Sequence, residues 1–194
     1  MEGGCLANHP KKGAREGRRI GFLDESGISE RPTVRRTWAP RGRTPTIVST
    51  GSWSVRSVVG VITCTPTGND PRLYIRIFRG SIHKEDVVRF LKELRYHAHG
   101  KLMLVWDRLA AHRATIVKEY IAAHPWITTK HFPSYAPELN PVEYLWATAK
   151  NRDLANVYPE GLEKLDGHIR RMKRRLQRRG DILKGFLIPS PTNY

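Results

Sequence analysis

One stretch of sequence indicates the fold class: LMLVWD, at residues 102–107. It is apolar until its final aspartate, and a short continuous apolar run of this kind is typical of a strand buried on both faces. Such strands occur in sheets that carry helices on both sides. We therefore expect Asp107 at the carboxyl end of a central strand, where the ligands of open α/β sheets collect.

On either side of this stretch, strand patterns and helix patterns alternate. The predicted strands cover residues 19–24, one or two strands within 46–63, then 73–78, 102–106 and 126–132. Turn-forming residues at 65–71 favour a hairpin between the second and third of these regions. The predicted helices run from Ser81 to Gly100, over 111–123, from Pro141, and within 160–186. This order predicts an α/β fold, with a mixed sheet flanked by helices.

The sequence predicts three parts along the chain. Residues 1–18 are rich in Gly, Lys and Arg without periodicity, which indicates a flexible basic tail. Residues 19–158 hold the predicted sheet, and residues 159–194 form a basic helical extension that packs on it. The apolar stripe of that extension repeats every three or four residues, at Leu162, Leu165, Ile169, Met172 and Leu176.

The charge balance indicates a polyanionic partner. Lys and Arg number 34 against 18 Asp and Glu, a net charge of +16, and nucleic acid is the commonest partner of such proteins. No apolar stretch is long enough for a membrane span, and no secretory signal is expected. Cys5 and Cys64 cannot form a disulfide framework or a four-ligand zinc site, so we expect a cytoplasmic location.

Three carboxylates are placed where they could carry chemistry. Asp24 and Asp107 are each expected to end a buried strand, and Glu143 begins a helix. Converging carboxylates in a basic protein suggest a divalent-metal site that acts on phosphates. Structural roles are the alternative: Asp24 could cap a local turn, Asp107 could cap the following helix, and Asn140 with Glu143 has the spacing of a capping box.

The motifs that contain these acids resemble a known family. The blocks are FLDESG at 22–27 with RTWAPRG at 36–42, LVWD at 104–107 with His112, and FPSYAPELNPVE at 132–143 followed by Trp146. In this order they resemble the catalytic domain of DDE transposases of the IS630/Tc1/mariner superfamily. The resemblance implies an RNase H-like fold in which Asp24, Asp107 and Glu143 hold two Mg²⁺ or Mn²⁺ ions. It also implies DNA cleavage at transposon ends, strand transfer into target DNA at TA sites, and a homodimer in the active complex.

Two features depart from the family pattern. Arg108 stands where the family often has Asn, and one more residue than usual separates Asp107 from Glu143. Full-length members also carry helix-turn-helix modules ahead of the catalytic domain, so we expect this chain to be the catalytic half alone.

Basic residues in three regions are candidates for phosphate contacts, with a solvated charged face as the alternative reading. Trp38, which lies in the first of these regions, could stack on bases or be buried under a loop. His112 could touch a phosphate or be a structural histidine. The candidate DNA-binding residues are Arg35, Arg36, Arg41 and Arg43, then Arg108 and His112, then Arg171, Arg174, Arg175 and Arg178.

Three functions agree with these patterns. The first is a transposase catalytic domain that cuts and joins DNA. The second is a structure-specific RNase H-like nuclease that cuts without joining, and the third is a non-catalytic, DNA-binding remnant of a transposase.

Overall fold

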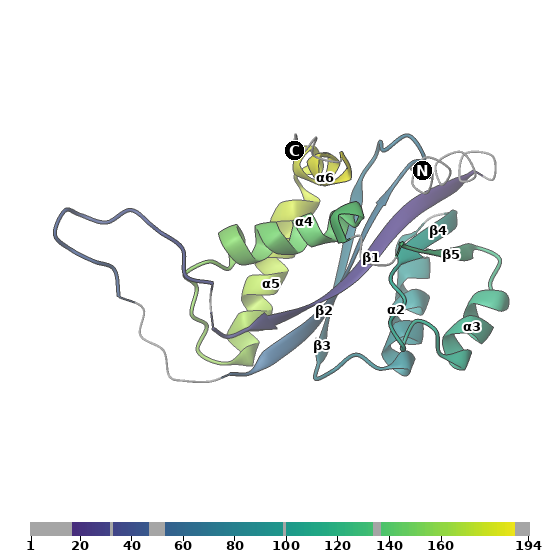
Figure 1. Ribbon diagram of the computed structural model, residues 1–194, viewed down its shortest axis with the longest axis horizontal. Helices are drawn as coiled ribbons and strands as arrows, with labels where there is room; N and C mark the ends of the chain where they lie inside the picture. Colours follow the sequence, from purple (N-terminus) through teal and green to yellow (C-terminus); the bar gives the residue numbers. More distant parts are fainter. Residues whose placement is uncertain (1–16, 32, 47–52, 99, 134–136, 189–194) are drawn as a thin grey trace.

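Five strands form one mixed sheet in the computed structural model of the chain, which describes residues 17–31, 33–46, 53–98, 100–133 and 137–188 (Figure 1). Almost all of the predicted tail at 1–18, with Cys5, therefore lies outside the described residues. The strands are β1 Arg18–Ser29, β2 Val55–Cys64, β3 Arg72–Arg79, β4 Lys101–Trp106 and β5 Ile127–His131, in the spatial order β3-β2-β1-β4-β5. The first three pair antiparallel, including the predicted hairpin, whereas β4 runs parallel to β1 and β5 parallel to β4. The predicted mixed sheet is confirmed.

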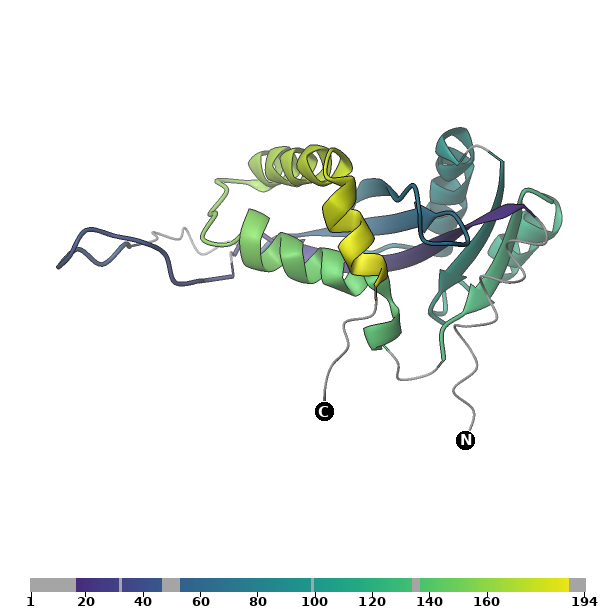
Figure 2. The same ribbon diagram turned by 90° about the horizontal axis from the view of Figure 1, so that it is seen from above.

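Helices cover both faces of the sheet. β4 is buried on both of its own faces, since Trp106 lies in the cluster beside α2 and Val105 packs with Phe132. On one face, α2 (Lys84–His97) and α3 (Thr115–Ala122) pack around Leu91 and Trp106. The other face is covered by α4 (Pro141–Thr148), α5 (Leu162–Gln177) and α6 (Gly180–Leu187), with Ile62 and Trp146 in its core. The short turns η1 (Pro137–Leu139) and η2 (Ala149–Asp153) flank α4. Figures 1 and 2 show the strands between the two groups of helices.

The helical segment predicted at 160–186 consists of two helices. α5 ends at Gln177 and α6 begins at Gly180. Leu176 and Leu183 are both fully buried in the same apolar cluster, so the chain turns between them to bring both helices onto one core. No helix in the described part of the chain has the length and apolar character to span a membrane.

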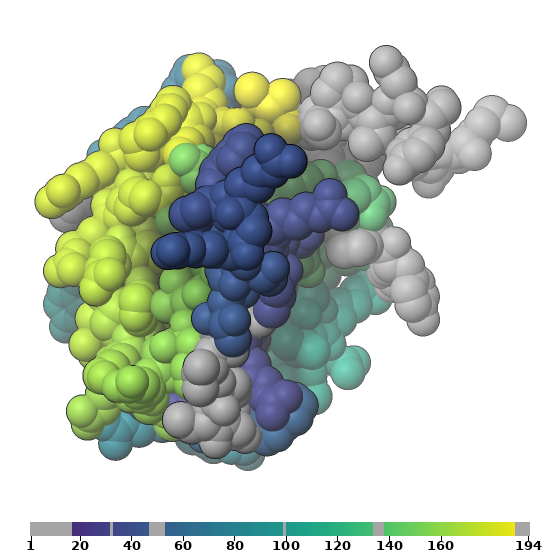
Figure 3. All heavy atoms as spheres, turned by 90° about the vertical axis from the view of Figure 1, so that its left-hand side faces the viewer, coloured from purple at the N-terminus to yellow at the C-terminus, as the bar shows by residue number. Residues whose placement is uncertain are grey.

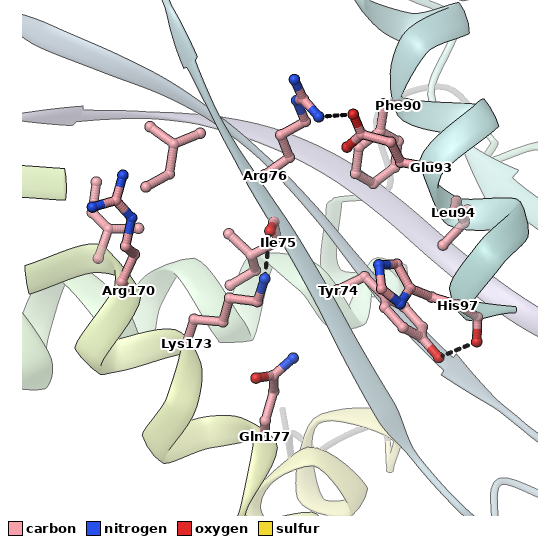
Figure 4. A pocket seen from close by; sticks show the side chains of 12 residues that line it. Tyr74, Ile75, Arg76, Phe90, Glu93, Leu94, His97, Arg170, Lys173 and Gln177 are labelled. Carbon is pink, nitrogen blue, oxygen red and sulfur yellow. Dashed lines mark hydrogen bonds and ion pairs between the residues drawn. The ribbon is translucent and has the colours of Figure 1, made fainter. Parts of the chain in front are cut away.

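β3 is an edge strand, and α5 covers its outer side. Lys173 Nζ donates a hydrogen bond to the Ile75 carbonyl, and Gln177 Nε2 donates one to the Leu73 carbonyl, each at 3.0 Å. Figure 4 shows both side chains beside a hollow of about 380 Å³ that α2 lines on its other side. Burial lowers the pKa of Lys173. Covering an edge in this way protects it from pairing with another chain.

Residues 33–46 form an arm that reaches away from the sheet (Figures 1 and 3). Every residue in it is exposed, and Trp38 is fully so, which rules out its burial under a loop. The base of the arm is fastened to the segment after η2. The Arg35 backbone N–H donates to Asn156 Oδ1 at 2.8 Å, and Asn156 Nδ2 donates back to the Arg35 carbonyl at 2.9 Å.

Candidate active site

Asp24 and Asp107 lie on neighbouring segments at the same level of the sheet. Parallel pairing between β1 and β4 runs up to Phe22 opposite Val105, and each aspartate follows two residues later. The prediction that Asp24 ends a strand is wrong, because β2 pairs with β1 as far as Ser29. What ends near Asp24 is the pairing with β4, so both aspartates lie where β1 and β4 part.

The first turn of α4 brings Glu143 to the same place. Asn140 caps the helix, since its side-chain oxygen accepts a hydrogen bond from the Val142 N–H at 3.1 Å. Pro141 occupies the first helical position, where its fixed backbone is favoured. Val142 is buried against the sheet, whereas Glu143 is exposed. The cap therefore fixes where the carboxylate of Glu143 enters the site.

Four carboxylates lie close enough to disturb one another. Burial raises the pKa of Asp24 to about 7, and the charge of Glu143 is the next largest cause, followed by that of Glu25. The Trp146 indole N–H opposes this shift by donating to Asp24 Oδ2 at 3.0 Å, and the charge of Asp107 raises the pKa further. A bound cation would relieve this repulsion.

His112 joins two of these carboxylates. Its Nδ1 lies 2.7 Å from Asp107 Oδ1 and its Nε2 lies 2.8 Å from Glu25 Oε1. The ring is completely buried and stacks on Trp106, with centroids 4.4 Å apart. Burial lowers the pKa of His112, but the hydrogen bonds to Asp107 and Glu25 raise it more, to about 9. At neutral pH the imidazolium therefore donates from both nitrogens.

The chain after β4 folds back to place His112 there. The Leu109 N–H donates to Asp107 Oδ1 at 3.0 Å, and the His112 N–H donates to the Leu109 carbonyl at 3.0 Å. The helix predicted at 111–123 consequently begins only at Thr115, as α3. Burial raises the pKa of Asp107, but the hydrogen bonds from His112 and Leu109 outweigh it and leave this pKa below its ordinary value.

Glu25 could not be identified as a site residue from the sequence, where it is one letter of the first motif. Successive side chains of a strand point to opposite faces, so Asp24 faces Trp146 of α4 while Glu25 faces His112. Its Oε2 is buried and has no hydrogen-bond partner among the described residues. The sequence offered one signal: Glu25 follows Leu23 by two residues and so lies on the same face of β1, and Leu23 lies in the core.

The surroundings of Asp107 suit a divalent cation. Ligand atoms of Glu25, Asp107 and His112 all lie within 4.8 Å of one another. His112, however, already bonds carboxylates through both nitrogens, and Mg²⁺ prefers oxygen ligands. Among the described residues, Asp24 accepts a hydrogen bond at Oδ2 and Asp107 accepts one at Oδ1. Each carboxylate therefore has a second oxygen that can bind a metal ion. Asp24 and Glu143 are not part of the group within 4.8 Å, so binding of the ion by Asp24, Asp107 and Glu143 stays a prediction.

The candidate DNA-binding residues near the arm and the site differ in their surroundings. The side chain of Arg35 is engaged at the base of the arm, where its Nε donates to Asn151 Oδ1 at 3.0 Å. Arg108 is exposed next to Asp107. The structure leaves no ring nitrogen of His112 free for the predicted phosphate contact. The other arm candidates, all exposed, are Arg36, Arg41 and Arg43.

The basic face of α5 forms a shallow hollow of about 370 Å³. Its lining residues are Arg171, Arg174, Arg175, Arg178 and Arg179. Arg175 is also a structural residue, because its Nε and Nη2 bond the half-buried Asp153 at 2.5 and 2.7 Å. Arg179 pairs with Asp181. Arg171, Arg174 and Arg178 form no ion pair within the described part of the chain and remain the strongest candidates in this helix.

Burial holds this charged helix in place. Leu165, Ile169, Met172 and Leu176 are each no more than 2% exposed. Burying one such side chain contributes about 1.5–3 kcal/mol, whereas a like-charged pair one turn apart costs roughly 0.2–0.5 kcal/mol. The apolar stripe therefore offsets the repulsion among the arginines without a bound polyanion.

Solved structures of similar shape define the fold class. The chain matches the Mos1 transposase paired-end complex with the left transposon end at a TM-score of 0.59 and 15% identity, over 93% of this chain and 59% of that one. It matches the Mos1 mariner transposase catalytic domain at a TM-score of 0.57 and 13% identity, over 94% of this chain and 88% of that one. The predicted RNase H-like fold is confirmed. The chain spans about 59% of the length of the Mos1 transposase in the complex.

The family follows from the sequence itself. The family model for DDE superfamily endonucleases matches residues 19–166. The chain therefore belongs to the DDE superfamily endonucleases, as its motifs predict. Among proteins with curated functions, none matches the chain.

Proposed function

We propose that this chain is the catalytic domain of a transposase, which cuts DNA at transposon ends and joins the freed 3′ end to target DNA. The observation that supports the proposal is that Asp24 on β1 is close enough to Asp107, after β4, and to Glu143, in the first turn of α4, for both charges to raise its pKa. The similar Mos1 transposase has been solved both as a paired-end complex and as a strand transfer complex, which supports both reaction steps.

Asp24, Asp107 and Glu143 are the proposed ligands of two Mg²⁺ or Mn²⁺ ions. When bound, such ions activate water and stabilise the leaving oxygen of a phosphodiester. Mos1 structures that contain Mn or Mg support this choice of cofactor. His112 would hold Asp107 in orientation through Oδ1, and Arg108 would neutralise a phosphate beside the site.

The DNA path in this proposal is defined by exposed arginines of the arm and of α5, which contact phosphates. The resemblance to the family further suggests insertion at TA dinucleotides and a homodimer on paired ends. Sequencing of insertion junctions tests the first, and light scattering with and without DNA tests the second. The cysteine content and the DNA partner fit a cytoplasmic location, associated with the nucleoid of a bacterium.

The proposal is tested by cleavage and joining with Mn²⁺ or Mg²⁺. We expect nicking of supercoiled DNA, joining of an oligonucleotide with a free 3′ hydroxyl, and neither in EDTA. Asp107→Asn is expected to lower both about 10³-fold, since a metal ion supplies several kcal/mol of transition-state stabilisation. Cutting without joining would identify a nuclease, and DNA binding without either activity would identify a non-catalytic remnant.

The α5 arginines are expected to set part of the salt dependence of DNA binding. Replacing Arg171, Arg174 and Arg178 with Gln removes three exposed charges and leaves the ion pair of Arg175 with Asp153 intact. Each lost phosphate contact lowers the slope of log K against log salt by about 0.9, so the total change should be about 2.7. Fluorescence anisotropy with a duplex over a series of salt concentrations measures it.

A matched control removes the same charge from the other face of the sheet. Arg89, Lys92 and Lys118 are exposed on α2 and α3, and their replacement with Gln should leave the slope unchanged. An equal fall in both triple variants would mean that the net charge of the domain, rather than the α5 face, binds DNA.

A further inference from the structure

Trp146 is the buried side chain that contacts Asp24 directly. It is 3% exposed, and its indole nitrogen lies 3.0 Å from Asp24 Oδ2. It follows Glu143 by three residues in α4, so the two lie one helical turn apart on the same side of the helix. α4 therefore supplies one carboxylate of the site and the hydrogen-bond donor to another.

Gly60 makes the room that this contact needs. It pairs with Asp24 in the β1–β2 register. A Cβ at this position would lie 2.8 Å from Trp146 Cζ2, 3.0 Å from Trp146 Cη2 and 3.3 Å from Leu145 Cδ2. The first distance is shorter than real Cβ contacts, and the atoms it meets belong to a rigid ring. Glycine is required here by space, since its backbone does not adopt a positive φ.

The hydrogen bond from Trp146 decides how the Asp24 carboxylate is presented. With Oδ2 held by the indole, the other oxygen of Asp24 is left for a ligand. The charges of the neighbouring carboxylates push against Asp24, so an unheld side chain would turn away from them. Groups that orient a metal ligand in this way typically change metal affinity or activity 10–100-fold when they are removed.

We propose that Gly60 and Trp146 are positioning residues of the active site: Gly60 forms the slot in which the indole lies, and the indole N–H holds Asp24 in the orientation that binds a divalent cation. This inference rests on the proposed function and adds to the three acids two residues that position one of them. It assigns to Trp146 a role beyond the packing of α4 on the sheet.

The test measures Mn²⁺ binding directly, by electron paramagnetic resonance titration of the full chain, together with nicking of supercoiled DNA. Trp146→Phe keeps a buried aromatic ring and removes the N–H. We expect its Mn²⁺ dissociation constant to rise roughly 10–100-fold, with nicking reduced to match. Gly60→Ala should act in the same direction, because it displaces the indole.

The double variant separates positioning from packing. In Gly60→Ala/Trp146→Phe the smaller phenyl ring leaves room for the new methyl group, so thermal stability should recover relative to Gly60→Ala alone. Mn²⁺ affinity should stay as low as in Trp146→Phe, because the N–H is still absent. Recovery of stability and Mn²⁺ affinity together would assign Gly60 and Trp146 to packing alone and overturn the inference. If Gly60→Ala does not fold, Trp146→Phe and the double variant still decide the question.

The control is Trp126→Phe, the same change at a buried tryptophan of the core cluster on the other face. It should leave Mn²⁺ affinity at the parental value. Parental Mn²⁺ affinity in Trp146→Phe, in a chain that binds Mn²⁺ and nicks DNA, would overturn the inference and leave the proposed function standing. A parent chain that neither binds Mn²⁺ nor nicks DNA would overturn both.

Discussion

The Asp24→Asn variant is expected to lose about 10³-fold in metal-dependent cleavage and yet to be more stable than the parent when no metal is present. The loss follows from the removal of a proposed metal ligand, which contributes several kcal/mol to the transition state. The gain follows from the surroundings of Asp24, which are buried and crowded by the charges of Glu143, Glu25 and Asp107. Asn keeps a carbonyl oxygen that can accept the hydrogen bond from Trp146.

The size of the gain depends on pH. The pKa of Asp24 is about 7 in the folded chain and 3.8 as a free side chain. Between these pH values the folded chain keeps a proton on Asp24 that the unfolded chain releases. The parent is therefore destabilised progressively as pH rises from about 4 to 7. At pH 8 the Asn variant should unfold with a free energy higher by on the order of 2 kcal/mol, and the gain should disappear near pH 4. Urea denaturation in EDTA at both pH values measures it.

Asp70→Asn is the matched control. Asp70 lies in the turn between β2 and β3, and hydrogen bonds from Arg72 and Arg19 lower its pKa. Its charge is stabilising above the pKa of the unfolded chain and this contribution is lost on acidification, which is the opposite sign to Asp24. The Asp70 variant should be no more stable than the parent at pH 8 and should cleave DNA normally. A gain in stability for both variants would trace the effect to net charge rather than to crowding at the site.

The sequence predicts a helix or strand correctly where its hydrophobic pattern lies within that one element. The apolar run of β4 predicted a strand buried on both faces, and the prediction is confirmed: α2 and α3 cover one face, and Val105 packs with Phe132 on the other. The helix predicted from Ser81 to Gly100 forms as α2 and buries one apolar face, but it begins at Lys84 and not at Ser81. His83 is its N-cap, and the His83 N–H donates to Asp86 Oδ2 at 3.1 Å. The start of the helix therefore shifts to a cap formed by His83 and Asp86, while the same apolar face of the helix stays buried.

Contacts between distant elements could not be read from the sequence. The bonds of His112 join residues on β1 and after β4, and they depend on the parallel pairing of these segments. For the same reason, the structural role of Arg175 could not be predicted. In the sequence it resembles the neighbouring arginines, but in the fold it bonds Asp153. Glu25 was overlooked because its partner is 87 positions away. The motifs indicated the three acids, whereas the groups that hold them became visible only in the assembled fold.

His112→Ala is expected to be the most destabilising change at the site, because it leaves two carboxylates without their shared donor. The ring of His112 is completely buried, stacks on Trp106 and bonds Asp107 and Glu25. Its pKa is about 9 in the folded chain against 6.5 for a free side chain, which corresponds to roughly 3 kcal/mol of stabilisation. Breaking a buried pair on one side costs a similar amount, about 3–5 kcal/mol.

The pH dependence of this loss identifies its cause. A raised pKa means that the contribution of His112 is fully present below about pH 6.5 and is lost as pH rises through about 9. The difference in unfolding free energy between parent and His112→Ala should therefore be largest at pH 6 and shrink by pH 10, in EDTA. His124→Ala is the control, since the ring of His124 stacks on Tyr120 and, among the described residues, bonds the Tyr120 carbonyl and no carboxylate. It should lose less stability and cleave DNA normally. A difference for His112→Ala that stays constant from pH 6 to 10 would mean that the ring acts through packing alone, and the charged bridge between Glu25 and Asp107 would have to be abandoned.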